Sequence, residues 1–168
     1  MPARLAQHLI EQGLVTAAIA SEALRTVERR GGTLDSALLE LEAISEKRIL
    51  QAMERVSGIR HVDLSDFETN ATAAALMTHQ VALQLNAVPL SIEENEVHIA
   101  LGYPISQSQL RKASYLIGRA IVPWCATEVR IKDWQSILYE TRLDRRYVLI
   151  LQDIDVERSR ATGRIPSS

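Results

Sequence analysis

Apolar residues recur with a helical period over the first 56 residues, and the same pattern occurs twice. A shift of 29 positions places the segment 4–27 on the segment 33–56. Two pairs of leucines then coincide: Leu5 with Leu34, and Leu9 with Leu38. Because apolar residues three and four positions apart share one helix face, each copy predicts a short helix, a tight turn and a longer helix. We expect the two copies to bury one apolar seam between them.

Helix-ending and helix-starting residues mark the turns of both copies. Gly13 can take the left-handed conformation that ends a helix, and Thr16 is a predicted N-cap of the helix that follows. In the second copy Ser45 occupies the capping position, and two consecutive glycines separate the copies. We therefore predict that residues 1–58 form a helical lobe of two tandem helix-turn-helix units.

After the repeats, apolar and polar residues alternate as they do in strands. The alternation predicts a β-hairpin from residues 87–92 and 96–101, joined by a polar turn. Residues 59–64 predict a short strand, and residues 73–86 predict a helix that breaks near residues 79–82.

The next segment predicts a helix, a strand and another helix. Ser106 is the expected N-cap of the first helix, and Gly118 its expected end. The run AIVPWCAT predicts a strand, in which Pro123 indicates an edge position or a bulge because proline lacks a backbone N–H. Thr127 is the expected N-cap of the last helix. This alternation of strands and helices predicts a small α/β lobe with a hairpin over residues 59–142.

The last segment, residues 143–168, combines a short apolar run with a polar tail. The run from Tyr147 to Leu151 has strong strand propensity and predicts a strand that joins its own sheet or a partner's sheet edge. The polar residues after it predict a mobile tail. Together the patterns predict an α+β fold, in which a tandem helical repeat lobe precedes a small α/β lobe.

Composition and charge are those of an ordinary soluble protein. Apolar residues make up 46% of the 168 residues, which is enough for a hydrophobic core, and the net charge is -2. No apolar run reaches the roughly 18 residues that cross a bilayer, and the amino terminus lacks the features of a signal peptide. We expect a cytoplasmic protein without direct membrane insertion.

Tandem helical pairs also occur in helix-turn-helix DNA readers, and Arg25, Arg29 and Arg30 lie together near the end of one predicted helix. Glu22 and Glu28 dilute this basic cluster. Because DNA affinity depends on neutralising several phosphates, the slightly acidic chain is not expected to bind nucleic acid.

The sequence lacks the common signatures of catalytic and metal sites. It has no GxxxxGK[ST] phosphate-binding loop, and its single cysteine, Cys125, excludes an internal disulfide and a thiolate-based structural zinc site. The histidines stand in unrelated predicted elements: His8, His61, His79 and His98. We predict no catalytic residue and no metal, and we predict that the protein is not an enzyme.

The order of these elements resembles the amino-terminal, MshEN-like domain of the type II secretion and type IV pilus assembly ATPases, the GspE, PilB and MshE group. The resemblance covers residues 3–142, and in the second lobe it rests on VALQLNAVPLSIEENEVHIALGYP followed by LRKASYLIGRAIVPWCATEVRI. It implies a bacterial docking and regulatory domain whose partners are protein components of a secretion or pilus machine. Because the sequence has no ATPase portion, we expect a free-standing relative of that domain or the front piece of a longer protein.

In the MshE-like branch, each repeat resembles the pattern RLGxxLxxxGxxxxxxLxxxLxxQ, and the two repeats bind cyclic di-GMP. The first copy here keeps five residues of the pattern: Arg4, Leu5, Leu9, Gly13 and Leu24. The second copy keeps only Leu34 and Leu38. The resemblance makes these residues the candidate ligand-binding residues.

The polar positions of the pattern are the ones that differ. Thr33 replaces an arginine that can give guanine two parallel hydrogen bonds, worth roughly 1 to 3 kcal/mol. Asp35 replaces a glycine and would bring a negative charge towards an anionic ligand. Val27 and Val56 replace the closing glutamines. A total loss on the order of 4 to 6 kcal/mol would abolish a micromolar site.

Two hypotheses follow from the resemblance. The first is a protein-protein adaptor or regulator without a cofactor, recruited to the inner membrane by a partner, in which cyclic di-GMP recognition is weak or lost. The second is a sensor that still binds cyclic di-GMP through Arg4 and Gly13 of the first repeat, as a homodimer that supplies this repeat twice.

Overall fold

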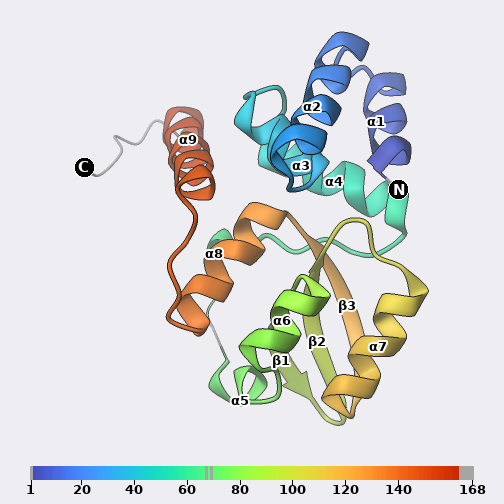
Figure 1. Ribbon diagram of the computed structural model, residues 1–168, viewed down its shortest axis with the longest axis vertical. Coiled ribbons are helices and arrows are strands. Elements are labelled where there is room, and N and C mark those ends of the chain that lie inside the picture. Colours follow the sequence, from blue (N-terminus) through green and yellow to red (C-terminus); the bar gives the residue numbers. More distant parts are fainter. Residues whose placement is uncertain (1, 67, 69, 163–168) are drawn as a thin grey trace.

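Four helices built by the tandem repeat form a bundle at one end of the molecule, next to the part that contains the sheet (Figure 1). The computed structural model describes residues 2–66, 68 and 70–162. The bundle helices are α1 (Pro2–Glu11), α2 (Ala17–Arg30), α3 (Leu34–Glu40) and α4 (Glu46–Ser57). Helix α1 packs on α4, and α2 packs on α3. The predicted α+β class is confirmed, with the helical part first.

The turns of the two repeats have the same backbone conformation, 29 positions apart. Gly13 and Glu42 both have positive φ angles, of 68° and 55°. Equivalent hydrogen bonds close the two turns: the Leu14 amide donates to the Leu9 carbonyl at 2.9 Å, and the Ala43 amide donates to the Leu38 carbonyl at 3.1 Å.

The second helix of each repeat also begins in the same way. Thr16 Oγ1 accepts a hydrogen bond from the Ile19 amide at 3.2 Å, and Ser45 Oγ accepts one from the Arg48 amide at 3.3 Å. Each hydroxyl satisfies one of the amides that the first turn of a helix leaves unpaired, so both predicted N-caps are confirmed. The duplication predicted from the apolar pattern is therefore present in the backbone.

The sheet contains three strands in the order β1-β2-β3. They are β1 (Ala87–Glu93), β2 (Glu96–Gly102) and β3 (Ala120–Ala126). Strands β1 and β2 form the predicted antiparallel hairpin, whereas β2 and β3 are parallel. Strand β3 lies at an edge of the sheet, where Pro123 is tolerated because its missing N–H would point away from the ladder.

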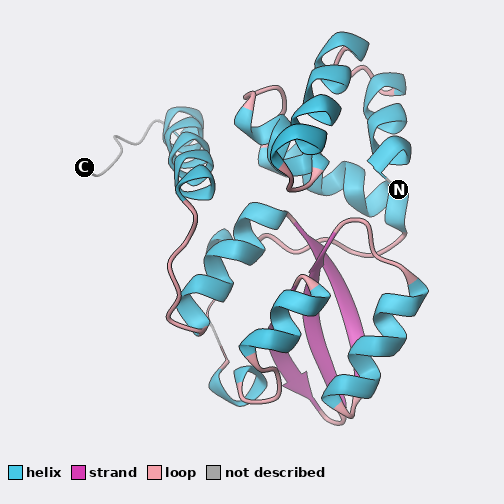
Figure 2. Ribbon diagram, in the orientation of Figure 1, coloured by secondary structure: helices cyan, strands magenta, loops and turns pink. Residues whose placement is uncertain are grey.

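Helices cover both faces of the sheet (Figure 2). They are α5 (Ala71–Ala74), α6 (His79–Leu85), α7 (Gln107–Ile117) and α8 (Glu128–Leu138). Ile99 and Leu101 pack with residues of α6 and α7, while Val88 and Leu90 pack with residues of α8. Both faces are therefore buried, as expected for a layered α/β unit.

Two local expectations for this part are corrected by the structure. Residues 59–64 do not form a regular strand; the bridge found in this segment joins His61 to Cys125. The helical segment 73–86 is interrupted before Thr78 and not at residues 79–82, because the Thr78 hydroxyl caps α6 by accepting from the Val81 amide at 3.2 Å.

The run from Tyr147 to Leu151, predicted as a strand, is helical and lies in α9 (Arg145–Thr162), beside the bundle (Figure 1). The prediction is wrong because tertiary packing overrides strand propensity: Ile150 and Ile154 share one helix face and are buried in the core of the bundle. The residues predicted as a mobile tail continue this helix to Thr162, and residues 163–168 lie outside the described part. No helix within the described ranges is long and apolar enough to cross a membrane.

The core of the bundle extends beyond the repeats. Cys125 and Val129 of the α/β part, together with Ile150 and Ile154 of α9, belong to the same buried cluster as the repeat leucines. The predicted segments 1–58, 59–142 and 143–168 therefore divide the chain by type of element, while one hydrophobic cluster spans all three.

Candidate functional site

The leucines shared by the two repeats lie in the core of the bundle. Each is 3% exposed or less, and all belong to one buried cluster: Leu5, Leu9, Leu34 and Leu38. Leu24 is partly buried and packs against the same cluster. The structure thus brings these candidate residues together, and it does so as the packing seam between the repeats.

The other two candidate residues lie at opposite ends of α1. Arg4 is exposed in the first turn, and among the described residues it has no ion pair with a carboxylate. Gly13 follows the last turn, where a Cβ atom would meet nothing within 4 Å. The first repeat therefore presents a cation and a tight turn that are separated by the length of the helix.

The changed polar positions of the second repeat form part of a contact between the bundle and α8. Asp35 is 1% exposed, and its Oδ2 accepts a hydrogen bond from the Glu128 amide at 2.8 Å. The Thr33 amide donates to Glu128 Oε1 at 3.3 Å. The expectation that Asp35 would turn its charge towards an anionic ligand is wrong, because this carboxylate is buried against the first turn of a helix.

Asp35 makes the capping hydrogen bond of α8 that was predicted for the Thr127 side chain. Thr127 precedes α8 as predicted, but its side chain makes no capping hydrogen bond, and its Oγ1 has no hydrogen-bond partner among the described residues. The Asp35 carboxylate instead satisfies an amide of the first turn, from 93 residues away in the chain. A negative charge at this end of a helix is also favoured by the helix dipole. Thr127 therefore holds the N-cap position, while α3 supplies the side-chain hydrogen bond at the start of α8.

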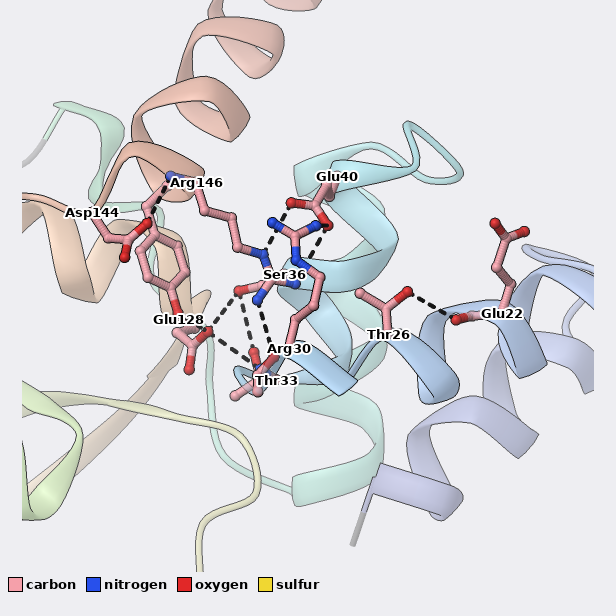
Figure 3. A network of polar contacts seen from close by, with 11 residues as sticks. Glu22, Thr26, Arg30, Thr33, Ser36, Glu40, Glu128, Asp144 and Arg146 are labelled. Atoms are coloured by element: carbon pink, nitrogen blue, oxygen red, sulfur yellow. Dashed lines mark hydrogen bonds and ion pairs between the residues drawn. The ribbon is translucent and has the colours of Figure 1, made fainter. Parts of the chain in front are cut away.

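Glu128 is the centre of this contact, which we call the lobe joint and define as Thr33, Asp35, Ser36, Glu128 and Tyr147. Figure 3 shows Glu128 beside Thr33 and Ser36. The Ser36 and Tyr147 hydroxyls each donate to Glu128 Oε1 at 2.9 Å. The joint connects α3, the start of α8 and the first turn of α9 through buried or partly buried groups. Such groups are costly to leave unpaired, so these bonds favour one arrangement of the three helices.

Burial shifts the acid–base behaviour of the joint. It raises the pKa of Asp35 from 3.8 to about 6; hydrogen bonds from Thr33 and from the Glu128 amide oppose the shift, and the Glu128 charge adds to it. Burial also raises the pKa of Tyr147, and the neighbouring Glu128 carboxylate adds to that shift. The Tyr147 hydroxyl therefore remains a donor at neutral pH.

Arg146 extends the contact from α9 to Glu40 of α3 (Figure 3) and to the glycines between the repeats. Its Nε donates to Glu40 Oε2 at 3.0 Å, and its Nη1 donates to the Gly31 carbonyl at 3.0 Å. Gly32 has a φ of 83°, and a Cβ there would lie 3.1 Å from Arg146 and 3.1 Å from Glu128. The glycine linker therefore allows the close approach of α9 and α8 to the bundle.

Besides the Arg146–Glu40 pair of α9, an ion pair joins α8 to the bundle. Arg130 Nε lies 3.0 Å from Glu46 Oε2, with side chains 9% and 5% exposed. Burial raises the pKa of Glu46, and the charge and hydrogen bond of Arg130 oppose the shift. Because removing one member would leave the other charge buried, this pair restricts how the bundle can sit on α8.

The joint was not predicted, although the sequence contains two traces of it. Tyr147, Ile150, Leu151 and Ile154 have helical spacing, which the strand propensity of the first residues concealed. Polar residues between the leucines of α3 also fall at buried positions, which indicates a specific polar partner. The identity of that partner follows only from the three-dimensional structure.

The described residues contain no group of three or more His, Cys, Asp or Glu side chains that could hold a metal ion. Cys125 is fully buried, and burial raises the pKa of its thiol to about 12. A thiol of this kind is a poor nucleophile because its reactive form is the thiolate.

Comparison with curated proteins identifies two pilus ATPases as relatives. The chain is 30% identical over 127 residues to the type IV pilus assembly ATPase PilB of Thermus thermophilus, which covers 74% of this chain and 14% of PilB. It is 23% identical over 133 residues to the type IV pilus assembly ATPase PilB of Myxococcus xanthus, which covers 79% of this chain and 24% of that protein. The chain therefore spans less than a quarter of each of these relatives.

Two solved structures have a similar fold. The structure of MshE with cdg superposes with a TM-score of 0.61 at 22% identity and covers 80% of this chain and 98% of that one. The N-terminal domain of XpsE superposes with a TM-score of 0.59 at 15% identity and covers 80% of this chain and 92% of that one.

A family comparison matches residues 57–145 to the MshEN domain. This range begins at the end of α4, contains the sheet and its covering helices, and ends where α9 begins. The match covers more than half of the chain, and its elements are those that the structure assembles around the sheet. The chain therefore belongs to the MshEN domain family.

Proposed function

We propose that this chain is a non-catalytic docking and regulatory module of a type IV pilus or type II secretion system, with cyclic di-GMP recognition weak or lost. The module works in the cytoplasm and is recruited to the inner membrane by a protein partner. Its membership of the MshEN family and its similarity to PilB support the kind of system. The proposed partners are protein components of that machine.

The observation that carries the proposal is the use of the second repeat as a structural contact. Where the cyclic di-GMP pattern has arginine and glycine, this chain has Thr33 and Asp35; the Asp35 carboxylate accepts from the Glu128 amide, and the Thr33 backbone amide donates to the Glu128 carboxylate. A ligand with two similar halves needs two open half-sites. Here the matching positions of the second half are occupied by the lobe joint, while the shared leucines are buried as packing residues.

Titration calorimetry with cyclic di-GMP tests the loss of ligand recognition. We expect no binding at micromolar concentration, since the missing polar groups remove on the order of 4 to 6 kcal/mol. The docking role is tested separately by cross-linking in the native cell followed by mass spectrometry of the captured proteins. If the cross-linked proteins include no component of a pilus or secretion machine, the docking role is wrong.

The alternative function is a cyclic di-GMP sensor that uses the first repeat. It is favoured by one observation: Arg4 is exposed and, in the part of the chain that the structure describes, is not held by a carboxylate. The neighbour MshE was solved with cdg, that is, cyclic di-GMP. Micromolar binding that disappears in Arg4→Ala, with a dimer forming on ligand addition, would establish this alternative in place of the first proposal.

A further inference from the structure

Two hollows lie between α1 and α4 of the bundle. Their volumes are about 290 Å³ and about 280 Å³, and His8 and Arg55 line both of them. The larger hollow is also lined by Gln12, Arg48 and Gln51. Arg4 and Val56, which line the smaller hollow, stand at positions of the repeat pattern, whereas no lining residue of the larger hollow does.

The spacing of the α4 residues explains the shape of the larger hollow. Arg48, Ala52 and Arg55 are four and three positions apart, so they lie on one face of the helix. Ala52 is 2% exposed and also lines the hollow. The small alanine leaves space between two long cationic side chains, and α1 closes the other side with His8, which is partly buried.

The charge of the larger hollow is uncompensated. No carboxylate lines it, and within the described residues neither Arg48 nor Arg55 forms an ion pair. The arginines that join α9 and α8 to the bundle behave differently, since Arg130 and Arg146 are both held by glutamates. The smaller hollow contains Glu11, whose Oε1 accepts a hydrogen bond from Gln7 at 2.9 Å.

A second basic cleft in the same bundle provides a comparison. On α2, Arg25 and Arg29 line a cleft together with Glu22 and Glu28, so two positive charges face two negative ones. The cleft on α2 is therefore electrically balanced, whereas the one between α1 and α4 carries a local positive charge on a chain whose net charge is -2.

We propose that the larger hollow binds a small phosphorylated molecule, with Arg48 and Arg55 on the phosphates and Gln12 and Gln51 on neutral polar groups of the ligand. Guanidinium groups match phosphate geometry with paired hydrogen bonds. Glutamine amides both donate and accept, which suits hydroxyl groups or the edge of a base. The concave shape and the volume fit a free small molecule better than a flat membrane surface.

Calorimetric titration of the whole chain with inorganic pyrophosphate and with ATP tests the site. We expect saturable binding of at least one probe that weakens as salt concentration rises, because the contacts are charged and exposed. The double variant Arg48→Gln/Arg55→Gln should lose about tenfold or more in affinity. The matched control, Arg25→Gln/Arg29→Gln, also removes two arginine charges, but in the balanced cleft on α2. It should bind the probes as the wild type does.

Three results would overturn the proposal: no saturable binding of either probe, equal binding by the Arg48→Gln/Arg55→Gln variant, or binding only to phosphatidylglycerol vesicles. The last result would mean that the larger hollow binds lipid headgroups at a membrane surface and not a free small molecule. Thermal unfolding of both double variants should match that of the wild type, since all four side chains are exposed. Arg4, the residue of the cyclic di-GMP alternative, is unchanged in both variants, and Arg48 lines only the larger hollow.

Discussion

The two helical repeats have the same backbone and different neighbours. Both end their first helix in a left-handed turn, and both start their second helix with a hydroxyl cap. The first repeat leaves Arg4 exposed, whereas the second uses Thr33 and Asp35 to hold α8. A duplicated fold therefore does not imply a duplicated site, because the polar positions of each copy depend on what packs against them.

The buried carboxylate of the second repeat shows how such a contact is stabilised. Burying the charge of Asp35 is unfavourable, as its raised pKa indicates. The Glu128 amide and the positive end of the α8 dipole offset part of this cost. In the first repeat the equivalent position is Ala6, which is 5% exposed and needs no partner.

The largest expected effect tests whether the apolar seam is equivalent in both repeats. Leu9→Ala and Leu38→Ala should each lower the free energy of unfolding by about 2 to 5 kcal/mol, because both side chains are fully buried. Urea denaturation measures the loss. Ile10→Ala is the control: Ile10 is 39% exposed and should change stability by about 0.5 kcal/mol or less. A small effect for only one of the two leucines would show that the repeats do not share the seam equally.

The next effect is specific to the second repeat and depends on pH. The pKa of Asp35 is raised from 3.8 to about 6, so its protonation stabilises the folded state at low pH, and this stabilisation is lost as pH rises through 6. Relative to Asp35→Asn, the wild type should lose roughly 1 to 3 kcal/mol of unfolding free energy between pH 4 and pH 7.

Urea denaturation of both proteins across this pH range gives the difference directly. Comparison with Asp35→Asn removes the contribution of other carboxyl groups, including Glu46, whose pKa is also raised. A constant difference between the two proteins from pH 4 to pH 7 would show that Asp35 titrates as it does in the unfolded chain.

The smallest expected effects concern the turns, and they have opposite signs. Gly13→Ala should lower the free energy of unfolding by about 1 kcal/mol, because alanine is strained at a φ of 68°. Steric contact adds nothing to this cost, since no atom lies within 4 Å of the new Cβ. Glu42→Gly should raise stability by about 0.5 to 1 kcal/mol, since Glu42 has a φ of 55°. Melting temperatures would show both shifts, and shifts of equal sign would contradict the equivalence of the turns.

Local features were predictable from the sequence because their causes lie within a few residues. The caps at Thr16 and Ser45 and the hairpin of β1 and β2 depend on hydrogen bonds and alternation inside short segments. The repeat itself was predictable because apolar spacing determines which face of each helix is buried. The resemblance to the MshEN family rested on the order of such elements, and it is confirmed.

The misjudged features depend on residues far apart in the chain. Tyr147 to Leu151 became helical because α9 finds an apolar surface to pack on, beside a bundle built by the first 57 residues. Thr127 is the N-cap residue as predicted, but Asp35 supplies the capping hydrogen bond in place of the Thr127 side chain. Propensity and capping rules describe the most favourable local choice, and a tertiary partner can replace that choice.

For this chain, the sequence alone determined the duplicated helical design, the hairpin and the family, because each is encoded by spacing along the chain. Only the tertiary structure decided that the second repeat holds α8 and α9, and that Arg48 and Arg55 border an open hollow with His8 across from them. The physical reason is that a polar or charged side chain acquires its role from the group it meets, and that group is set by folding rather than by position in the sequence.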